Sequence, residues 1–134
     1  MILVTGGAGF IGSHTCIALA QAGVPYLILD NFCNSRRSVL ERLGRITGAQ
    51  PQCIEGDVRD EALLARVFAQ HPIDGVIHFA ALKAVGESVR EPLRYYDNNV
   101  SGTVTLLRAM QAAGVPTLVF SSPATAHGGP ASVP

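Results

Sequence analysis

Three glycines near the start of the chain, Gly6, Gly9 and Gly12, follow an apolar run and open a stretch of helical periodicity. Gly6 permits a tight turn, Gly9 lets backbone amides approach a ligand without a Cβ in the way, and Gly12 lets the helix lie close to a sheet. The N-terminus of a helix presents free N–H groups and the positive end of its dipole. This spacing therefore predicts a turn that holds a pyrophosphate.

An acidic residue, Asp30, ends the second apolar run, about 20 residues beyond the glycine turn. At this distance a carboxylate accepts hydrogen bonds from the ribose hydroxyls of a dinucleotide. The alternative is a solvated turn aspartate. A carboxylate here repels a 2′-phosphate, which favours NAD over NADP, although Arg36 and Arg37 lie close enough to weaken that preference.

The elements that must position these residues follow from alternating patterns along the chain. Short apolar runs, several of them bounded by glycine, proline or aspartate, alternate with stretches in which apolar residues recur at helical spacing. The expected strands are 2–4, 26–29, 52–55, 75–79 and 117–120. The expected helices are 11–22, 38–47, 61–70 and 93–113, with Gly23, Gly48 and Gly114 as their stops.

This alternation predicts an α/β fold of the Rossmann type, a doubly wound parallel sheet of about five strands in the order 3-2-1-4-5. Right-handed crossovers place helices on both faces and leave the loops after the strands at one edge, where function is expected. We expect an NAD-binding Rossmann domain, in part, over residues 1–122. An irregular tail rich in glycine and proline is expected over 123–134.

Composition narrows the classes of partner. Among 134 residues, ten basic side chains balance ten acidic ones, which argues against nucleic acid and membrane surfaces as partners. Cys16, Cys33 and Cys53 form no CxxC pair and lie near no histidine cluster, so we expect reduced thiols and no metal site. The chain begins with a strand and has no membrane-spanning run, which predicts a cytoplasmic protein.

Five segments in chain order resemble the UDP-glucose 4-epimerases of the extended short-chain dehydrogenase/reductase family. They are 5–14, 29–35, 55–57, 76–88 and 95–100, and the resemblance runs from Met1 to about Ser122. In that family, tightly bound NAD takes hydride from C4 of a UDP-hexose and returns it to the opposite face. The resemblance thus implies interconversion of UDP-glucose and UDP-galactose. It also implies homodimers as one assembly, with the oligomeric state left open.

The resemblance implies four groups of NAD contacts besides the three glycines. They lie at the pyrophosphate, at the adenosine ribose, at the adenine and along the rest of the cofactor, where Asn98 helps to orient it. The Asp57 carboxylate accepts from the exocyclic amine, and the Lys83 ammonium donates to cofactor oxygens. The groups are Phe10 and Ile11; Asp30, Asn31, Phe32, Cys33, Asn34 and Ser35; Asp57 and Val58; and Phe79, Ala80, Ala81 and Lys83.

Other interpretations apply to single residues. Asp57 is alternatively the N-cap of a helix, and Asn98 a polar residue in a turn or a helix. Lys83 is alternatively an ordinary solvated lysine. His78, inside an expected strand, is interpreted as a core histidine with satisfied hydrogen bonds rather than a base. Cys16 and Cys53 are interpreted as small buried apolar groups.

The sequence also departs from the family pattern. Pro123 occupies the place of the catalytic serine, and it has neither a hydroxyl nor an N–H. The family's Tyr-x-x-x-Lys pair does not occur in the 134 residues. We therefore expect an epimerase fragment that ends before the remaining strands and the sugar-binding domain, with no catalytic residues and no activity alone. An NAD-binding module without catalysis and a fragment of a related nucleotide-sugar dehydratase or decarboxylase are the alternatives; the stretch 82–88 favours the epimerases.

Overall fold

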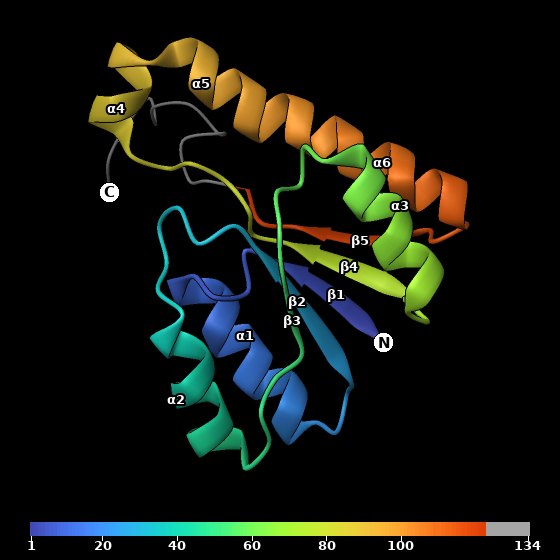
Figure 1. Ribbon diagram of the computed structural model, residues 1–134. Coiled ribbons are helices and arrows are strands. Elements are labelled where there is room, and N and C mark those ends of the chain that lie inside the picture. Colours follow the sequence, from blue (N-terminus) through green and yellow to red (C-terminus); the bar gives the residue numbers. More distant parts are fainter. Residues whose placement is uncertain (123–134) are drawn as a thin grey trace, which may run out of the picture.

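A computed structural model describes residues 1–122 of the chain as a five-stranded parallel sheet in the order β3-β2-β1-β4-β5, as predicted (Figure 1). The strands are β1 (Ile2–Thr5), β2 (Tyr26–Asp30), β3 (Cys53–Glu55), β4 (Gly75–His78) and β5 (Thr117–Phe120). The helical elements are α1 (Phe10–Gln21), α2 (Ser38–Thr47), α3 (Glu61–Gln70), α4 (Val85–Arg90), α5 (Pro92–Tyr96), η1 (Asp97–Ser101) and α6 (Gly102–Ala113).

Strands β1 and β2 are apolar except at their last residues, Thr5 and Asp30, because helices cover both faces of the sheet (Figure 1). Leu3 and Leu29 pack into the core cluster that includes Leu106 of α6. Val4 and Ile28 pack on the opposite side, and all four strand residues are 0 or 1% exposed. Successive residues of one strand thus pack into two cores on opposite faces of the sheet. This packing holds the carboxyl ends of β1, β2 and β4 in fixed register.

Helix boundaries follow the predicted signals closely. α2 and α6 end at Gly48 and Gly114, which have left-handed φ values of 77° and 69°. Asp60 is the N-cap of α3, and its side chain accepts a hydrogen bond from the Leu63 N–H at 2.9 Å. Asp57 is therefore not the cap of this helix.

The single helix predicted over 93–113 is wrong in detail. A one-turn α4 precedes it, and five residues within it, Asp97–Ser101, form the π-helical segment η1. Six residues are too few to show helical periodicity, so α4 had no detectable signal. The π-helical turn widens the helix by one residue and brings two asparagines, Asn98 and Asn99, to the side that faces the sheet edge.

Apolar side chains that are 41 to 81% exposed recur along α4, α5, η1 and α6. We call these side chains the outer stripe; its members are Val85, Val89, Leu93, Tyr96, Val100, Val104 and Leu107.

Strand β5 lies at the sheet edge with Val119 and Phe120 about half exposed, as expected for the last strand. Within residues 1–122, no helix is long and apolar enough to cross a membrane.

Candidate functional site

A cleft opens at the carboxyl edge of the sheet, between the loops that follow β1, β2, β3 and β4 and the segment η1. It holds about 550 Å³ of space that is continuous with solvent. In parallel sheets of this order, this edge between the two central strands is where ligands bind. The cleft is lined by Gly6, Gly9, Leu29, Asp30, Asn31, Cys33, Asn34, Ser35, Gly56, Val58, Phe79, Ala80, Ala81, Leu82 and Asn98.

The glycine turn is closed by backbone contacts that leave no room for side chains. Gly6 has a φ of +71°, and a Cβ there would lie 2.7 Å from the Ala80 nitrogen. A Cβ on Gly12 would lie 2.3 Å from the Gly6 carbonyl oxygen. The predicted role of Gly6 in the turn is confirmed. The close approach at Gly12 is to the turn itself rather than to the sheet.

Asp30 is buried at the end of β2 and shapes the loops on both sides of it. It is 8% exposed, and its carboxylate accepts hydrogen bonds from the Ala8 N–H, the Phe32 N–H and the Ser35 hydroxyl, each at 2.9 Å. The interpretation as a solvated turn aspartate is therefore wrong. Since a carboxylate has about four acceptor positions, acceptor capacity remains for a ligand.

The loop after β2 is held in an uncommon conformation. Phe32 has a φ of 56°, in the left-handed region that non-glycine residues rarely adopt. The guanidinium of Arg37 lies over its ring at 5.0 Å and also pairs with Glu55. The Arg37 charge is thus already engaged by protein groups.

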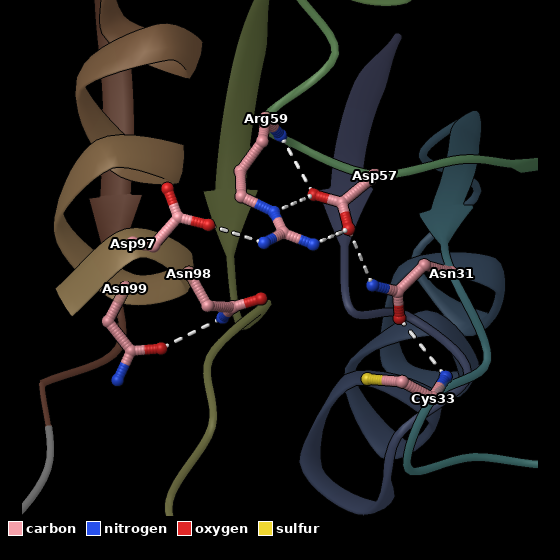
Figure 2. A network of polar contacts seen from close by, with 7 residues as sticks. All are labelled: Asn31, Cys33, Asp57, Arg59, Asp97, Asn98 and Asn99. Carbon is pink, nitrogen blue, oxygen red and sulfur yellow. Dashed lines mark hydrogen bonds and ion pairs between the residues drawn. The ribbon is translucent and has the colours of Figure 1, made fainter. Parts of the chain in front are cut away.

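A network of charged and amide side chains joins the loops after β2 and β3 to η1 (Figure 2). The Asp57 carboxylate accepts from the Arg59 backbone N–H and side chain and from the Asn31 amide. Arg59 also pairs with Asp97 of η1 at 2.5 Å. These hydrogen bonds, above all those from the Arg59 side chain, hold the pKa of Asp57 well below its usual range. No sequence motif pointed to Arg59.

The loop after β4 is clamped to η1 by one asparagine. The Leu82 N–H donates to Asn99 Oδ1 at 2.8 Å, and Asn99 Nδ2 donates to the Leu82 carbonyl at 2.9 Å. Asn98, 8% exposed, donates to the same Oδ1 at 2.9 Å. Its interpretation as a helix residue is confirmed, and it also lines the cleft. Lys83 is exposed and lines a neighbouring pocket instead.

His78 lies in β4 with both ring nitrogens in hydrogen bonds, as interpreted. Nδ1 is 2.6 Å from Thr5 Oγ1 and Nε2 is 3.1 Å from Thr103 Oγ1. Because Thr103 donates its own proton to the Asn99 carbonyl, Nε2 carries the histidine proton and Nδ1 accepts from Thr5. Burial, together with repulsion from Lys83, lowers the pKa of His78 to about 4. The ring is therefore neutral near pH 7.

The cysteines and the remaining predicted residues are placed as follows. Cys16 is fully buried and Cys53 half-buried, and all three thiols are free. Residues 1–122 contain no group of three side chains able to hold a metal ion. Pro123 and the expected tail lie outside the described residues. Predicted site residues that do not line the cleft are Phe10, Ile11, Gly12, Phe32, Asp57 and Lys83.

Three residues line the cleft that sequence reasoning did not include, namely Leu29, Gly56 and Leu82. Leu29 and Gly56 flank the carboxyl ends of β2 and β3. The rule that ligands bind at the carboxyl ends of parallel strands would have identified both. Leu82 lies in a loop, and no local pattern marks it.

The chain matches the NAD dependent epimerase/dehydratase family over residues 2–134. It is 58% identical over 133 residues to the UDP-glucose 4-epimerase of Yersinia pestis. The matched segment covers 99% of this chain and 39% of that protein, so the chain spans less than half of its relative's length. Crystal structures of UDP-glucose 4-epimerases superpose with a TM-score of 0.95. One is from Stenotrophomonas maltophila with bound NAD and formylated UDP-arabinopyranose, at 54% identity; the other is from Bifidobacterium longum with NAD+ and UDP, at 53%. The matches cover 99% of this chain and 40% of each of those chains.

Proposed function

Because the chain belongs to the NAD dependent epimerase/dehydratase family, we propose that its cleft holds NAD as the cofactor-binding part of a UDP-glucose 4-epimerase. The observation that carries the proposal is Asp30, a buried carboxylate beside the glycine turn at the carboxyl edge of the sheet. The glycine turn after β1, the Asp30 carboxylate at the end of β2 and the strand order together form the arrangement that dinucleotide-binding folds require.

The described residues fit a dinucleotide. The space that a Cβ on Gly9 would enter is bounded only by the Gly6 carbonyl, so backbone amides at the start of α1 can approach a pyrophosphate. Asp30 retains acceptor capacity for ribose hydroxyls, and Asn34 and Ser35 line the same part of the cleft. Val58 and Asn98 also line the cleft.

The charges in the loop after β2 favour NAD over NADP. The buried Asp30 carboxylate would face a 2′-phosphate and repel it. Two nearby cations, Arg36 and Arg37, weakened this preference on sequence grounds; Arg36 is exposed, whereas Arg37 pairs with Glu55 and lies over the Phe32 ring. A 2′-phosphate would have to compete with that carboxylate for the guanidinium.

The substrate we propose is a UDP-hexose, in line with UDP and a UDP-sugar in the crystallised relatives. NAD, when bound, would accept hydride from C4 of the sugar and return it. The proposed contribution of residues 1–122 is to bind and orient this cofactor, because the family's Tyr-x-x-x-Lys pair does not occur in the 134 residues. An NAD-binding module without catalysis is the second candidate.

Calorimetric titration of the 134-residue protein with NAD and with NADP tests the proposal. We expect dissociation constants for NAD in the micromolar range and weaker binding of NADP. Asp30→Ala removes charge-assisted hydrogen bonds to ribose, each about 1.5 to 3 kcal/mol, so its affinity for NAD should fall at least about tenfold. Asp74→Ala is the matched control, since Asp74 lies directly before β4 at the opposite edge of the sheet.

The absence of binding at millimolar NAD, by a protein shown to be folded by circular dichroism, would contradict the proposal. Equal losses in Asp30→Ala and Asp74→Ala would show that the effect is general destabilisation. Turnover of UDP-galactose by the 134-residue protein would reject the second candidate and the expectation that this chain is inactive alone.

We propose a second copy of the chain as the partner of the outer stripe. Exposed apolar side chains along several helical turns are typical of protein interfaces, and the members of the stripe are 41 to 81% exposed. Sedimentation equilibrium should give twice the chain mass, and Leu93→Glu should return the protein to the monomer mass. If the wild-type protein is a monomer at concentrations on the order of 100 micromolar, the proposed assembly is wrong.

A further inference from the structure

The Arg59 side chain makes three hydrogen bonds in the Figure 2 network and links the loop after β3 to η1. Its Nε lies 2.9 Å from Asp57 Oδ1 and its Nη2 lies 2.8 Å from Asp57 Oδ2, which is a two-pronged pairing. Its Nη1 reaches Asp97 Oδ2 at 2.5 Å. The guanidinium therefore holds the loop after β3 against η1.

The acceptor positions of Asp57 are all filled. Oδ1 accepts from the backbone N–H and from Nε of Arg59, and Oδ2 accepts from Nη2 of Arg59 and from Nδ2 of Asn31 at 3.0 Å. A carboxylate offers about four such positions. An incoming donor must therefore replace one of these four hydrogen bonds.

The four hydrogen bonds differ in how easily they can be exchanged. Two come from the charged guanidinium and one from a backbone N–H directly beside the carboxylate, whereas Asn31 offers a neutral side-chain amide. Charge-assisted hydrogen bonds are about twice as strong as neutral ones. Asn31 lines the cleft, whereas neither Arg59 nor Asp57 does, so a ligand in the cleft meets the Asn31 amide before it meets the carboxylate. The position on Oδ2 now filled by Asn31 is thus the one open to exchange with a ligand in the cleft.

We propose that Arg59 is a positioning residue for recognition of the adenine amine. By occupying three acceptor positions of Asp57, it fixes the carboxylate and leaves a single position, next to the cleft, for an exocyclic amine that displaces the Asn31 amide. This inference rests on the proposed binding of NAD. It adds a residue that touches no cofactor atom and still sets the selectivity for the amino-substituted purine.

The link to Asp97 gives a way to separate this role from ordinary stabilisation. Asp97 lies next to Asn98, which lines the cleft, and its side chain is 57% exposed. Asp97→Asn removes the ionic partner on η1 but leaves the pairing of Arg59 with Asp57 in place. It disturbs the same network without freeing the Asp57 carboxylate.

The test compares NAD with nicotinamide hypoxanthine dinucleotide, in which a ring carbonyl replaces the exocyclic amine. A carbonyl oxygen facing the Asp57 carboxylate is repelled, and a hydrogen bond to a charged group is lost. The wild-type protein should therefore prefer NAD by at least about tenfold in calorimetric titration. Arg59→Met keeps the apolar stem but frees the carboxylate to turn, and the preference should shrink to about twofold or less. Asp97→Asn should retain the wild-type preference.

Each outcome decides between the proposals. A wild-type protein that binds neither dinucleotide rejects both the proposed function and the role of Arg59. Equal binding of the two dinucleotides by the wild type leaves NAD binding standing and overturns recognition of the amine. An undiminished preference in Arg59→Met overturns the role of Arg59 alone. If Arg59→Met does not fold by circular dichroism, Arg59→Lys replaces it, with an expected preference between those of the wild type and the methionine variant because lysine cannot pair with both oxygens.

Discussion

The two sides of the cleft are built by different means. On one side, the turn from Gly6 to Gly12 is closed by backbone atoms, with contacts so tight that a Cβ at either end would meet other backbone atoms at 2.7 Å or less. On the other side, the loop at Leu82 is held by side-chain hydrogen bonds from Asn99 of η1. Backbone atoms packed against each other cannot yield to a larger group, whereas a side-chain clamp can open and close again.

The two sides of the cleft therefore suit different parts of a ligand. The side formed by the glycine turn is suited to hold a rigid part, such as a pyrophosphate, in one position. The clamped side lies between the cleft and the pocket that contains Lys83, and its loop can be released at the cost of a few hydrogen bonds.

The largest effect is expected from Gly12→Ala. The added Cβ would lie 2.3 Å from the Gly6 carbonyl oxygen and 2.8 Å from the Gly7 Cα, both backbone atoms that cannot rotate away. We expect a loss of about 4 kcal/mol in the free energy of unfolding, measured with urea, together with loss of NAD binding.

Gly86→Ala is the matched control on the clamped side. Gly86 lies within α4, and a Cβ there would meet nothing within 4 Å. Since alanine favours helix more than glycine does, this variant should gain about 0.5 to 1 kcal/mol. A loss at Gly86 similar to that at Gly12 would contradict the proposed difference between the two sides.

The contrast between the two sides also explains what the sequence could predict. The glycine turn, Asp30 and the strand order follow from local signals, namely φ requirements, apolar runs and a fixed spacing. The η1 segment, the Asn99 clamp and the Arg59 network depend on contacts between residues 17 to 38 positions apart and on side-chain geometry. A polar residue in a helix has no sequence signal that tells whether it faces solvent or grips a distant loop.

The second prediction concerns His78, which joins the two sides through Thr5 and Thr103. Burial lowers its pKa to about 4, below the ordinary value of 6.5, so the folded state favours the neutral ring. The stabilisation is therefore complete above about pH 6.5 and is lost as the pH falls through 4. The loss should be on the order of 3 kcal/mol, measured as the change in the free energy of unfolding between these pH values.

His78→Gln supplies the control for this pH dependence, because glutamine has a donor and an acceptor but does not titrate. Its free energy of unfolding should change less between pH 6.5 and pH 4 than that of the wild type. Identical pH profiles for the two proteins would show that carboxylates, and not this histidine, control stability in that range.

The smallest effect is expected from Asn99→Ala, which opens the clamp directly. The variant removes the acceptor for the Leu82 N–H and the donor to the Leu82 carbonyl, and it leaves Leu82, which is 6% exposed, with unpaired backbone groups. We expect a loss of about 2 kcal/mol on urea unfolding and faster hydrogen exchange at the Leu82 amide, with the exchange protection of the buried strand β1 reduced only by the global loss. Thr105→Ala, whose hydroxyl bonds only within its own helix to the Ser101 carbonyl, should cost less than about 0.5 kcal/mol. If the Leu82 amide exchanges at the wild-type rate in Asn99→Ala, the loop is held by its backbone packing, and the two sides of the cleft are built alike.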